Sequence, residues 1–226
     1  MIRIACLMGL LVFTFTQSTR ADFQKDLHDC DFAGERPELQ ISACSKIINS
    51  NRVEGLLLAP FYSNRGVAFK RKGQLVDAIN DYSEAIARDP NLFIALHNRA
   101  NAFFLMGKFG KAIKDYNKAI ILKPDFAEGY NERGNLHRAV GDFDRAFEDY
   151  DTAIMFAPRN ARFYADRGIA YEKKGSYVLA ILEYQKSFDL GFRHQRLLDK
   201  LGDPEYGRPI TDPPSQYLAH NLYDNF

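Results

Sequence analysis

The chain of 226 residues lacks the long apolar runs, the charge imbalance and the histidine spacing on which several functional classes depend. The apolar run over residues 4–15 is too short to cross a bilayer comfortably. The five histidines show no paired spacing that would hold a metal on one helix face. There is no GxSxG element, phosphate-binding glycine loop or HExxH motif. We therefore expect no catalytic residues, no metal and no cofactor, which indicates a protein that is not an enzyme.

Residues 1–21 are typical of a secretory signal peptide. Arg3 gives the start a positive charge, residues 4–15 form the apolar core, and residues 19–21 provide a small-residue cleavage site. We expect the mature chain to begin near Asp22, in the periplasm or outside the cell.

The charge and cysteine counts narrow the class further. Removing the signal peptide takes two arginines and no acid, which leaves 28 basic and 29 acidic residues. Such a balance makes bulk nucleic-acid binding a poor prediction. Cys30 and Cys44 are then the two remaining cysteines, and an even count in an oxidising compartment predicts one disulfide. The alternative, two buried free thiols, becomes the better interpretation only if the chain is not exported.

A period of 34 residues runs through the middle of the chain. The stretch SNRGVAF, which begins at Ser63, is followed by HNRANAF, NERGNLH and ADRGIAY at this spacing. A fixed period in this range indicates a repeat architecture. The columns in register are Arg65, Arg99, Arg133 and Arg167; Gly73, Gly107, Gly141 and Gly175; Ala78, Ala112, Ala146 and Ala180; and Tyr82, Tyr116, Tyr150 and Tyr184.

Each period predicts a pair of helices. In residues 59–92, apolar and small side chains at helical spacing over 62–69 predict a first helix with one inward face. Gly73 suits the left-handed residue that follows a helix, and residues 75–86 carry a second apolar stripe. Pro90 ends the second helix. One pair cannot bury both of its apolar faces, so neighbouring pairs must stack.

This pattern resembles the tetratricopeptide repeat (TPR), a helix-turn-helix unit with glycine, tyrosine, alanine and proline at fixed positions. The resemblance implies an all-α fold, a right-handed TPR solenoid of antiparallel helix pairs. The expected segments are the signal peptide 1–21; a degenerate repeat with a disulfide, 22–58; the repeats 59–92, 93–126, 127–160 and 161–194; a capping helix, 195–202; and a tail rich in proline and aromatic residues, 203–226.

The degenerate first repeat is expected to take its second helix from residues 39–48. In that register Cys44 occupies the small-residue column, and Cys30 lies in the first helix. A bond between them would stabilise this pair by roughly 3 kcal/mol in the chain-entropy model.

The arginine column places a guanidinium on an interior stripe, where an unpaired charge costs several kcal/mol. An acid follows each arginine by 16 residues, which favours a structural ladder of Arg–carboxylate pairs. The alternative is a row of guanidinium groups offered to an anionic ligand. The pairs are Arg65 with Asp81, Arg99 with Asp115, Arg133 with Asp149 and Arg167 with Glu183.

The TPR resemblance also implies binding, because the first helices of TPR domains line a concave groove that holds an extended peptide or a partner's helix. Asparagines there can donate and accept hydrogen bonds, although a solvated face is an equally good interpretation of any single residue. The implied groove residues are Lys70, Arg71, His97, Asn101, Phe104, Leu105, Asn131, Asn135 and Arg138, with Ser63, Val67, Arg162, Glu172 and Lys173 on the same face. The positions of a C-terminal carboxylate clamp do not match.

The sequence therefore favours a non-enzymatic scaffold or adaptor for a protein or peptide partner, with no nucleic-acid partner and no membrane span after signal removal. The alternative is a protein associated with cell-wall peptidoglycan or carbohydrate, either enzymatic or regulating an envelope enzyme. Self-association through exposed solenoid ends is a third possibility. The repeat columns specify the scaffold and leave the partner unnamed.

Overall fold

The structure is a computed structural model that describes residues 20–32, 34 and 36–192. The predicted capping helix, 195–202, and tail, 203–226, lie outside the described residues, as does the predicted signal peptide except for its last two residues. Those two residues belong to a helix over 20–32.

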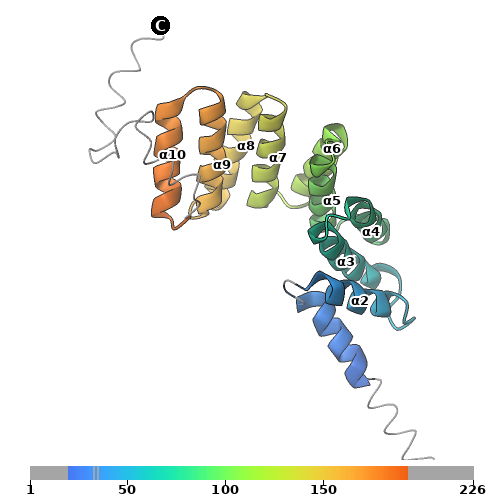
Figure 1. Cartoon of the computed structure of the whole chain (residues 1–226). Coiled ribbons are helices and arrows are strands. Elements are labelled where there is room, and N and C mark those ends of the chain that lie inside the picture. The colour runs from blue at the N-terminus through green and yellow to red at the C-terminus, as the bar shows by residue number, and fades with distance from the viewer. Residues whose placement is uncertain (1–19, 33, 35, 193–226) are drawn as a thin grey trace, which may run out of the picture. The chain divides into compact units, whose positions relative to one another are not determined.

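The described residues form helices and no strand (Figure 1), which confirms the all-α prediction. The helix over 20–32 is followed by α2 (Pro37–Ile48), the 3-10 helix η1 (Gly55–Leu58), α3 (Ala59–Arg71), α4 (Leu75–Arg88), α5 (Phe93–Leu105), α6 (Phe109–Leu122), α7 (Ala127–Ala139), α8 (Phe143–Phe156), α9 (Ala161–Lys173) and α10 (Tyr177–Asp189). The chain divides into two compact units, residues 1–122 and 123–226.

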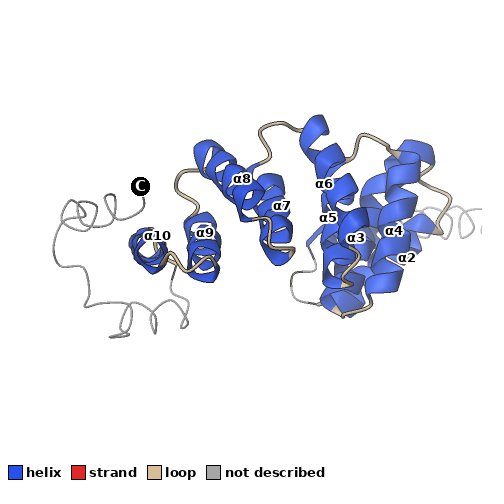
Figure 2. Cartoon of the chain, turned by 90° about the horizontal axis from the view of Figure 1, so that it is seen from above, coloured by secondary structure: helices blue, strands red, loops and turns tan. Residues whose placement is uncertain are grey.

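Within each unit the helices pack as consecutive antiparallel pairs, α3 with α4, α5 with α6, α7 with α8 and α9 with α10 (Figure 2). Gly73 makes the turn of the first of these pairs with a φ of +75°, a conformation that costs glycine nothing. The backbone N–H of Gly73 donates to Lys70 O, and that of Gln74 donates to Phe69 O. These two bonds satisfy carbonyls at the end of α3, as glycine C-caps do.

The tyrosine column explains why the first helices need a small residue. The ring of Tyr82 is fully buried against Gly66, where an added Cβ would lie 2.7 Å from Tyr82 Cε1. The same close approach joins Gly168 to Tyr184, at 2.6 Å. Only glycine, or alanine as in the second repeat, leaves room for the ring.

Alanines from three successive helices hold neighbouring pairs together. Ala59 of α3, Ala85 of α4 and Ala95 of α5 are fully buried in one cluster, with Tyr62 and Leu92 packed against it. The small side chains let the helix backbones approach closely, and the larger residues fill the remaining space. This packing is the stacking that a single pair requires to bury its second face.

The N-terminal pair, helix 20–32 with α2, is held by a disulfide between Cys30 and Cys44, both fully buried. The buried residues of α2 align with those of α4 at an offset of 38 residues. This alignment places Cys44 opposite the tyrosine column, not the small-residue column expected from the sequence. The reason is a four-residue insertion relative to the 34-residue period, in the connection that contains η1.

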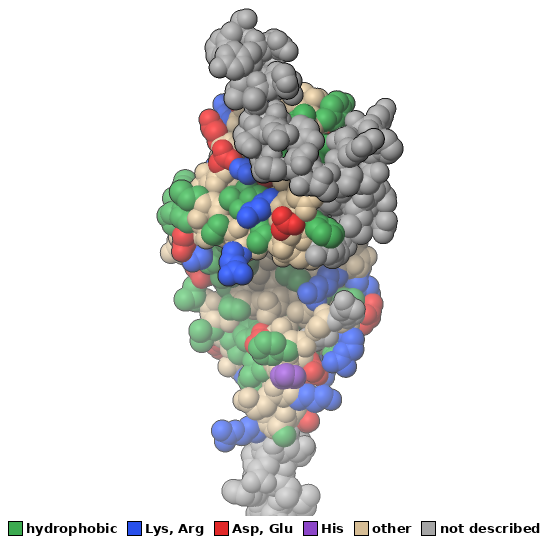
Figure 3. Space-filling model, turned by 90° about the vertical axis from the view of Figure 1, so that its left-hand side faces the viewer, with side chains coloured by type: hydrophobic (Ala, Val, Ile, Leu, Met, Phe, Trp, Pro, Cys, Tyr) green, Lys and Arg blue, Asp and Glu red, His purple; other side chains and the backbone are tan. Residues whose placement is uncertain are grey.

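The surface offers charges of both signs. On the face drawn in Figure 3, basic and acidic side chains are interspersed with apolar ones. Among the described residues, none of the helices is both long enough and apolar enough to span a membrane.

Candidate partner-binding face

The arginines of the first helices reach acids on the second helices of their own pairs. Arg65 donates from Nε to Asp81 Oδ2 at 2.7 Å and from Nη2 to Asp81 Oδ1 at 2.8 Å. Two matching pairs repeat this two-point geometry at 2.6–2.9 Å: Arg99–Asp115 and Arg133–Asp149. The three aspartates are buried, so the planar, charge-assisted bonds satisfy carboxylates that have lost most of their water.

The pairing also connects neighbouring repeats. Arg65 Nη1 donates to Ser45 Oγ at 2.9 Å, and Arg99 Nη1 donates to Ser83 Oγ at 3.0 Å. Each of these arginines therefore ties its first helix to its own second helix and to the preceding one. The bond from Arg65 to Asp81 raises the pKa of this guanidinium above its ordinary value.

The fourth pair differs in geometry. Arg167 Nη2 donates to Glu183 Oε1 at 2.7 Å, while its Nη1 donates to Asp151. Glu183 Oε2 and Arg167 Nε are buried without a hydrogen-bond partner among the described residues. Burial raises the pKa of Glu183, and the bond and charge of Arg167 only partly oppose this rise. The extra methylene of glutamate thus goes with a one-point contact.

The side chains predicted to line a groove lie on the first helices, and we call this set the first-helix face. In unit 1–122 its centre is a buried cluster of His97, Asn101 and Tyr116. Asn101 Nδ2 lies 3.0 Å from His97 Nε2, and the Tyr116 hydroxyl donates to Asn101 Oδ1. The Asn101 amide is therefore engaged with its neighbours in the same unit.

Four other predicted residues of this unit lie nearer to solvent. Leu105 is 62% exposed, whereas Phe104 is partly buried and packs its ring against Phe109 at 5.7 Å between centroids. Arg71 Nη1 donates to the carbonyl of Gly34 at 2.7 Å. Lys70 is partly buried.

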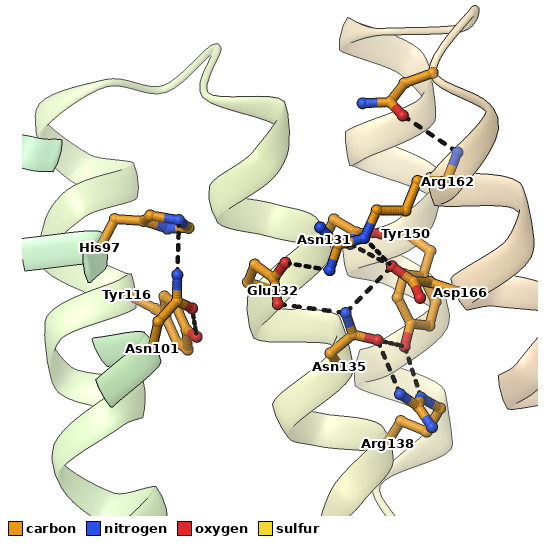
Figure 4. Close-up of polar contacts among 11 residues, drawn as sticks. His97, Asn101, Tyr116, Asn131, Glu132, Asn135, Arg138, Tyr150, Arg162 and Asp166 are labelled. Atoms are coloured by element: carbon orange, nitrogen blue, oxygen red, sulfur yellow. Dashed lines mark hydrogen bonds and ion pairs between the residues drawn. The ribbon is translucent and has the colours of Figure 1, made fainter. Parts of the chain in front are cut away.

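In unit 123–226 the first-helix face carries a larger polar cluster, drawn in Figure 4. Asn131 Nδ2 donates to Asp166 Oδ2 at 2.7 Å, and Asn135 Nδ2 approaches the same oxygen at 3.3 Å. Arg162 Nη2 donates to Glu132 Oε1 at 2.9 Å, and its Nε lies 3.5 Å from Asp166 Oδ2. The cluster joins α7 to α9 through side chains alone.

The other end of the Asn135 amide is fixed from α7 and α8. Asn135 Oδ1 accepts from Arg138 Nη2 and from the Tyr150 hydroxyl, both at 3.0 Å. Arg138 Nε also donates to the Tyr150 oxygen, at 3.1 Å. Burial raises the pKa of Tyr150, so its hydroxyl keeps its proton and acts as a donor. These bonds orient the Asn135 amide nitrogen towards the carboxylates.

Asn131 and Asn135, predicted to offer hydrogen bonds to a peptide, are 1% and 6% exposed. Their amide nitrogens are used within the cluster, so they organise its carboxylates instead of presenting donors to solvent. Sequence reasoning did not single out Glu132 and Asp166, because acids are frequent along these helices. Their signal is that they are 34 residues apart and therefore occupy one column, where the first two repeats carry Asn64 and Asn98.

Across residues 20–32, 34 and 36–192, the structure brings together no group of three or more potential metal ligands of the His, Cys, Asp or Glu type. His137 lies 3.9 Å from Asp149, and burial lowers its pKa, which favours the neutral ring.

Comparison with known proteins identifies the repeat. A family model described as TPR repeat matches residues 66–107, 100–141 and 134–175. No curated protein matches the chain. A crystal structure of MamA is similar over 68% of this chain and 88% of its own, with 24% identity and a TM-score of 0.58.

Two further solved structures are similar. The APC/C hetero-tetramer Cut9-Hcn1 matches 73% of this chain and 32% of its own, with 18% identity and a TM-score of 0.64. The first TPR domain of Spaghetti (RPAP3), bound to the HSP90 peptide SRMEEVD, matches 52% of this chain and 93% of its own. Its identity is 25% and its TM-score is 0.50. Together these matches show the TPR fold.

Proposed function

Because the chain belongs to the tetratricopeptide repeat proteins, we propose that it is a non-enzymatic scaffold that binds a protein or peptide partner along its first-helix face. The carrying observation is the polar cluster of α7 and α9. The fold's own ties are made by the arginine ladder between first and second helices, whereas this cluster lies on the face where curved solenoids hold their partners.

The RPAP3 domain supports this mode of binding, since that protein is similar to more than half of this chain and holds a peptide. This chain has Ser63 and Val67 where a carboxylate clamp has a lysine and an asparagine, and Glu132 in place of a later cation. The partner we propose is therefore not a chaperone tail of that kind.

The exposed apolar side chain of Leu105 gives the best site for a test. A photo-crosslinking amino acid at Leu105, 62% exposed, should capture a defined partner in cells, which mass spectrometry identifies. The matched control is Leu57, 68% exposed on η1 and outside the first-helix face. The purified partner should then bind the wild type and lose affinity when Leu105 is replaced by Asp.

Equal capture from Leu57 and Leu105 would contradict binding along this face. Retention of the purified chain by isolated cell-wall fragments, with no protein captured from Leu105, would favour the cell-wall alternative.

The proposal includes export, supported by the signal-like residues 1–21 and by the buried Cys30–Cys44 disulfide. The mass of the protein recovered from the periplasm or medium should correspond to a chain beginning near Asp22. Cysteine alkylation without reductant should leave that mass unchanged. Recovery of the full-length chain in the cytoplasm would contradict export.

A further inference from the structure

The polar cluster of α7 and α9 has more hydrogen-bond acceptors than donors. It contains the two carboxylates of Glu132 and Asp166, whose side chains are 18% and 13% exposed. Within the cluster Asp166 Oδ2 takes all the contacts made by Asn131, Asn135 and Arg162 to that residue. Donors are therefore in short supply at a site that holds two nearly buried negative charges.

Asn131 provides an independent sign of the same shortage. Its side chain is 1% exposed, and its Oδ1 is buried without a hydrogen-bond partner among the described residues. Its Nδ2 binds Asp166, so the amide lies within the cluster, beside the Arg162 side chain that reaches the same carboxylate oxygen (Figure 4). A buried acceptor left unmade is costly and points to a missing donor.

Arg162 is the cation that contacts the two carboxylates in the described part of the chain, and its side chain is 57% exposed. The nearby Arg138 adds positive charge, but its donors point to Asn135 Oδ1 and the Tyr150 oxygen. Arg162 therefore lies over the carboxylates from the solvent side. A long side chain held this way loses rotamer freedom, so another cation can compete for its place.

We propose that this cluster is a subsite for one basic side chain, arginine or lysine, of a partner peptide, and that Arg162 occupies the subsite in the free protein. This inference rests on the proposed function. A guanidinium offers five donors and an ammonium three, and either supplies what Glu132, Asp166 and Asn131 lack. An acidic side chain would instead place a third carboxylate beside two that are nearly buried.

The test uses four pools of fluorescent heptapeptides with randomised flanks and a central Arg, Lys, Gln or Glu. Their binding to the full mature chain is measured by polarisation. The Arg and Lys pools should bind more tightly than the Gln and Glu pools. Glu132→Gln should weaken their binding about tenfold, as expected for a lost charge-assisted bond. Arg162→Gln should strengthen it several-fold, because the internal competitor is gone.

The matched controls remove the same charges from α8, with Glu148→Gln for the acid and Arg145→Gln for the base; both residues are exposed. They should leave the affinity for the basic pools unchanged, and melting curves should show that all four variants fold. The sign for Arg162→Gln separates this proposal from a purely structural cluster, whose disruption would not improve binding.

Several results would overturn the subsite. A preference for the Glu pool, or weaker binding by Arg162→Gln, would mean that Arg162 itself recognises an anion. Equal binding of all pools, unaffected by Glu132→Gln, would remove the subsite and leave the scaffold function in place. If no pool binds the wild type or Arg162→Gln, the proposed peptide-binding function falls with it.

Discussion

The N-terminal helix pair and the four full repeats solve the same packing problem with different residues. In a full repeat such as the first, Gly66 faces the buried ring of Tyr82, and Arg65 binds Asp81. In the N-terminal pair a disulfide replaces the glycine–tyrosine contact, and Ala43 stands at the aligned position of Asp81.

The difference shows that the buried acid and the arginine depend on each other. Asp29 precedes Cys30 where Arg65 precedes Gly66, so the N-terminal pair has no arginine at that position for an acid to bind. Without that cation a buried aspartate would be an uncompensated charge, and alanine fits instead. Arg65 still ties the following repeat to α2, through Ser45.

Breaking one arginine pair should have the largest effect. Arg99→Ala leaves Asp115 buried without its two-point partner, and we expect the free energy of unfolding to fall by about 3–5 kcal/mol. Denaturant unfolding followed by circular dichroism measures the change. The control Arg145→Ala removes a side chain that is 70% exposed and should shift stability by less than about 0.5 kcal/mol.

An unchanged stability for Arg99→Ala would contradict the structural ladder. If that variant also lost its partner, the arginine column would instead serve an anionic ligand.

Removing the disulfide should affect the N-terminal pair selectively. Replacing both Cys30 and Cys44 by Ser, which lie 14 residues apart, should cost roughly 3 kcal/mol by freeing the unfolded chain. Hydrogen exchange should show faster exchange over 20–48, while the amides of α5 and α6 keep their protection. Equal loss of protection in both regions would contradict the local role of the disulfide.

The sequence predicted the helix pairs well because their determinants repeat along the chain. The 34-residue spacing of Arg65, Gly73 and Tyr82 reflects contacts made within one pair, so each period carries the whole instruction. The 16-residue spacing from Arg65 to Asp81 likewise matches a contact present in the structure. The four-residue insertion before α3 breaks this spacing, and the register assigned to Cys44 was therefore wrong.

The first-helix face was harder to predict because its contacts run sideways between repeats. Asn131 looked like a donor for a ligand, but Asp166, 35 residues later, takes that bond. Such a pairing joins two different columns and leaves no periodic signal. Asn135 is engaged in the same way, so the amides hold the carboxylates while Glu132 and Asp166 give the face its chemistry. The predicted binding role of this face stays a prediction.

A methyl group in the glycine column should sharpen the contrast between packing and helix propensity. Gly168→Ala places a Cβ 2.6 Å from Tyr184 Cε1, and we expect a loss of about 1–3 kcal/mol from overpacking. Propensity alone predicts a gain of roughly 1 kcal/mol for this change in a helix. Denaturant unfolding therefore decides between opposite signs. The reverse change Ala100→Gly, where the second repeat already carries a Cβ, should cost about 0.5–1 kcal/mol.

The smallest expected effect concerns the odd fourth pair, Arg167 with Glu183. Glu183→Asp should allow the two-point geometry of the other pairs, offset in part by the loss of one buried methylene. The raised pKa of Glu183 means that the folded state holds its proton more tightly than the unfolded chain. Its contribution to stability therefore falls as pH rises from the ordinary value of 4.5 towards the raised one. Urea unfolding at pH 4 and pH 7 should show the variant gaining about 0.5–1 kcal/mol on the wild type between the two, the size of one hydrogen bond. Comparing the two proteins at each pH cancels the titration of all other carboxyl groups, so an equal difference at both would mean that Glu183 titrates alike in the folded and unfolded chains.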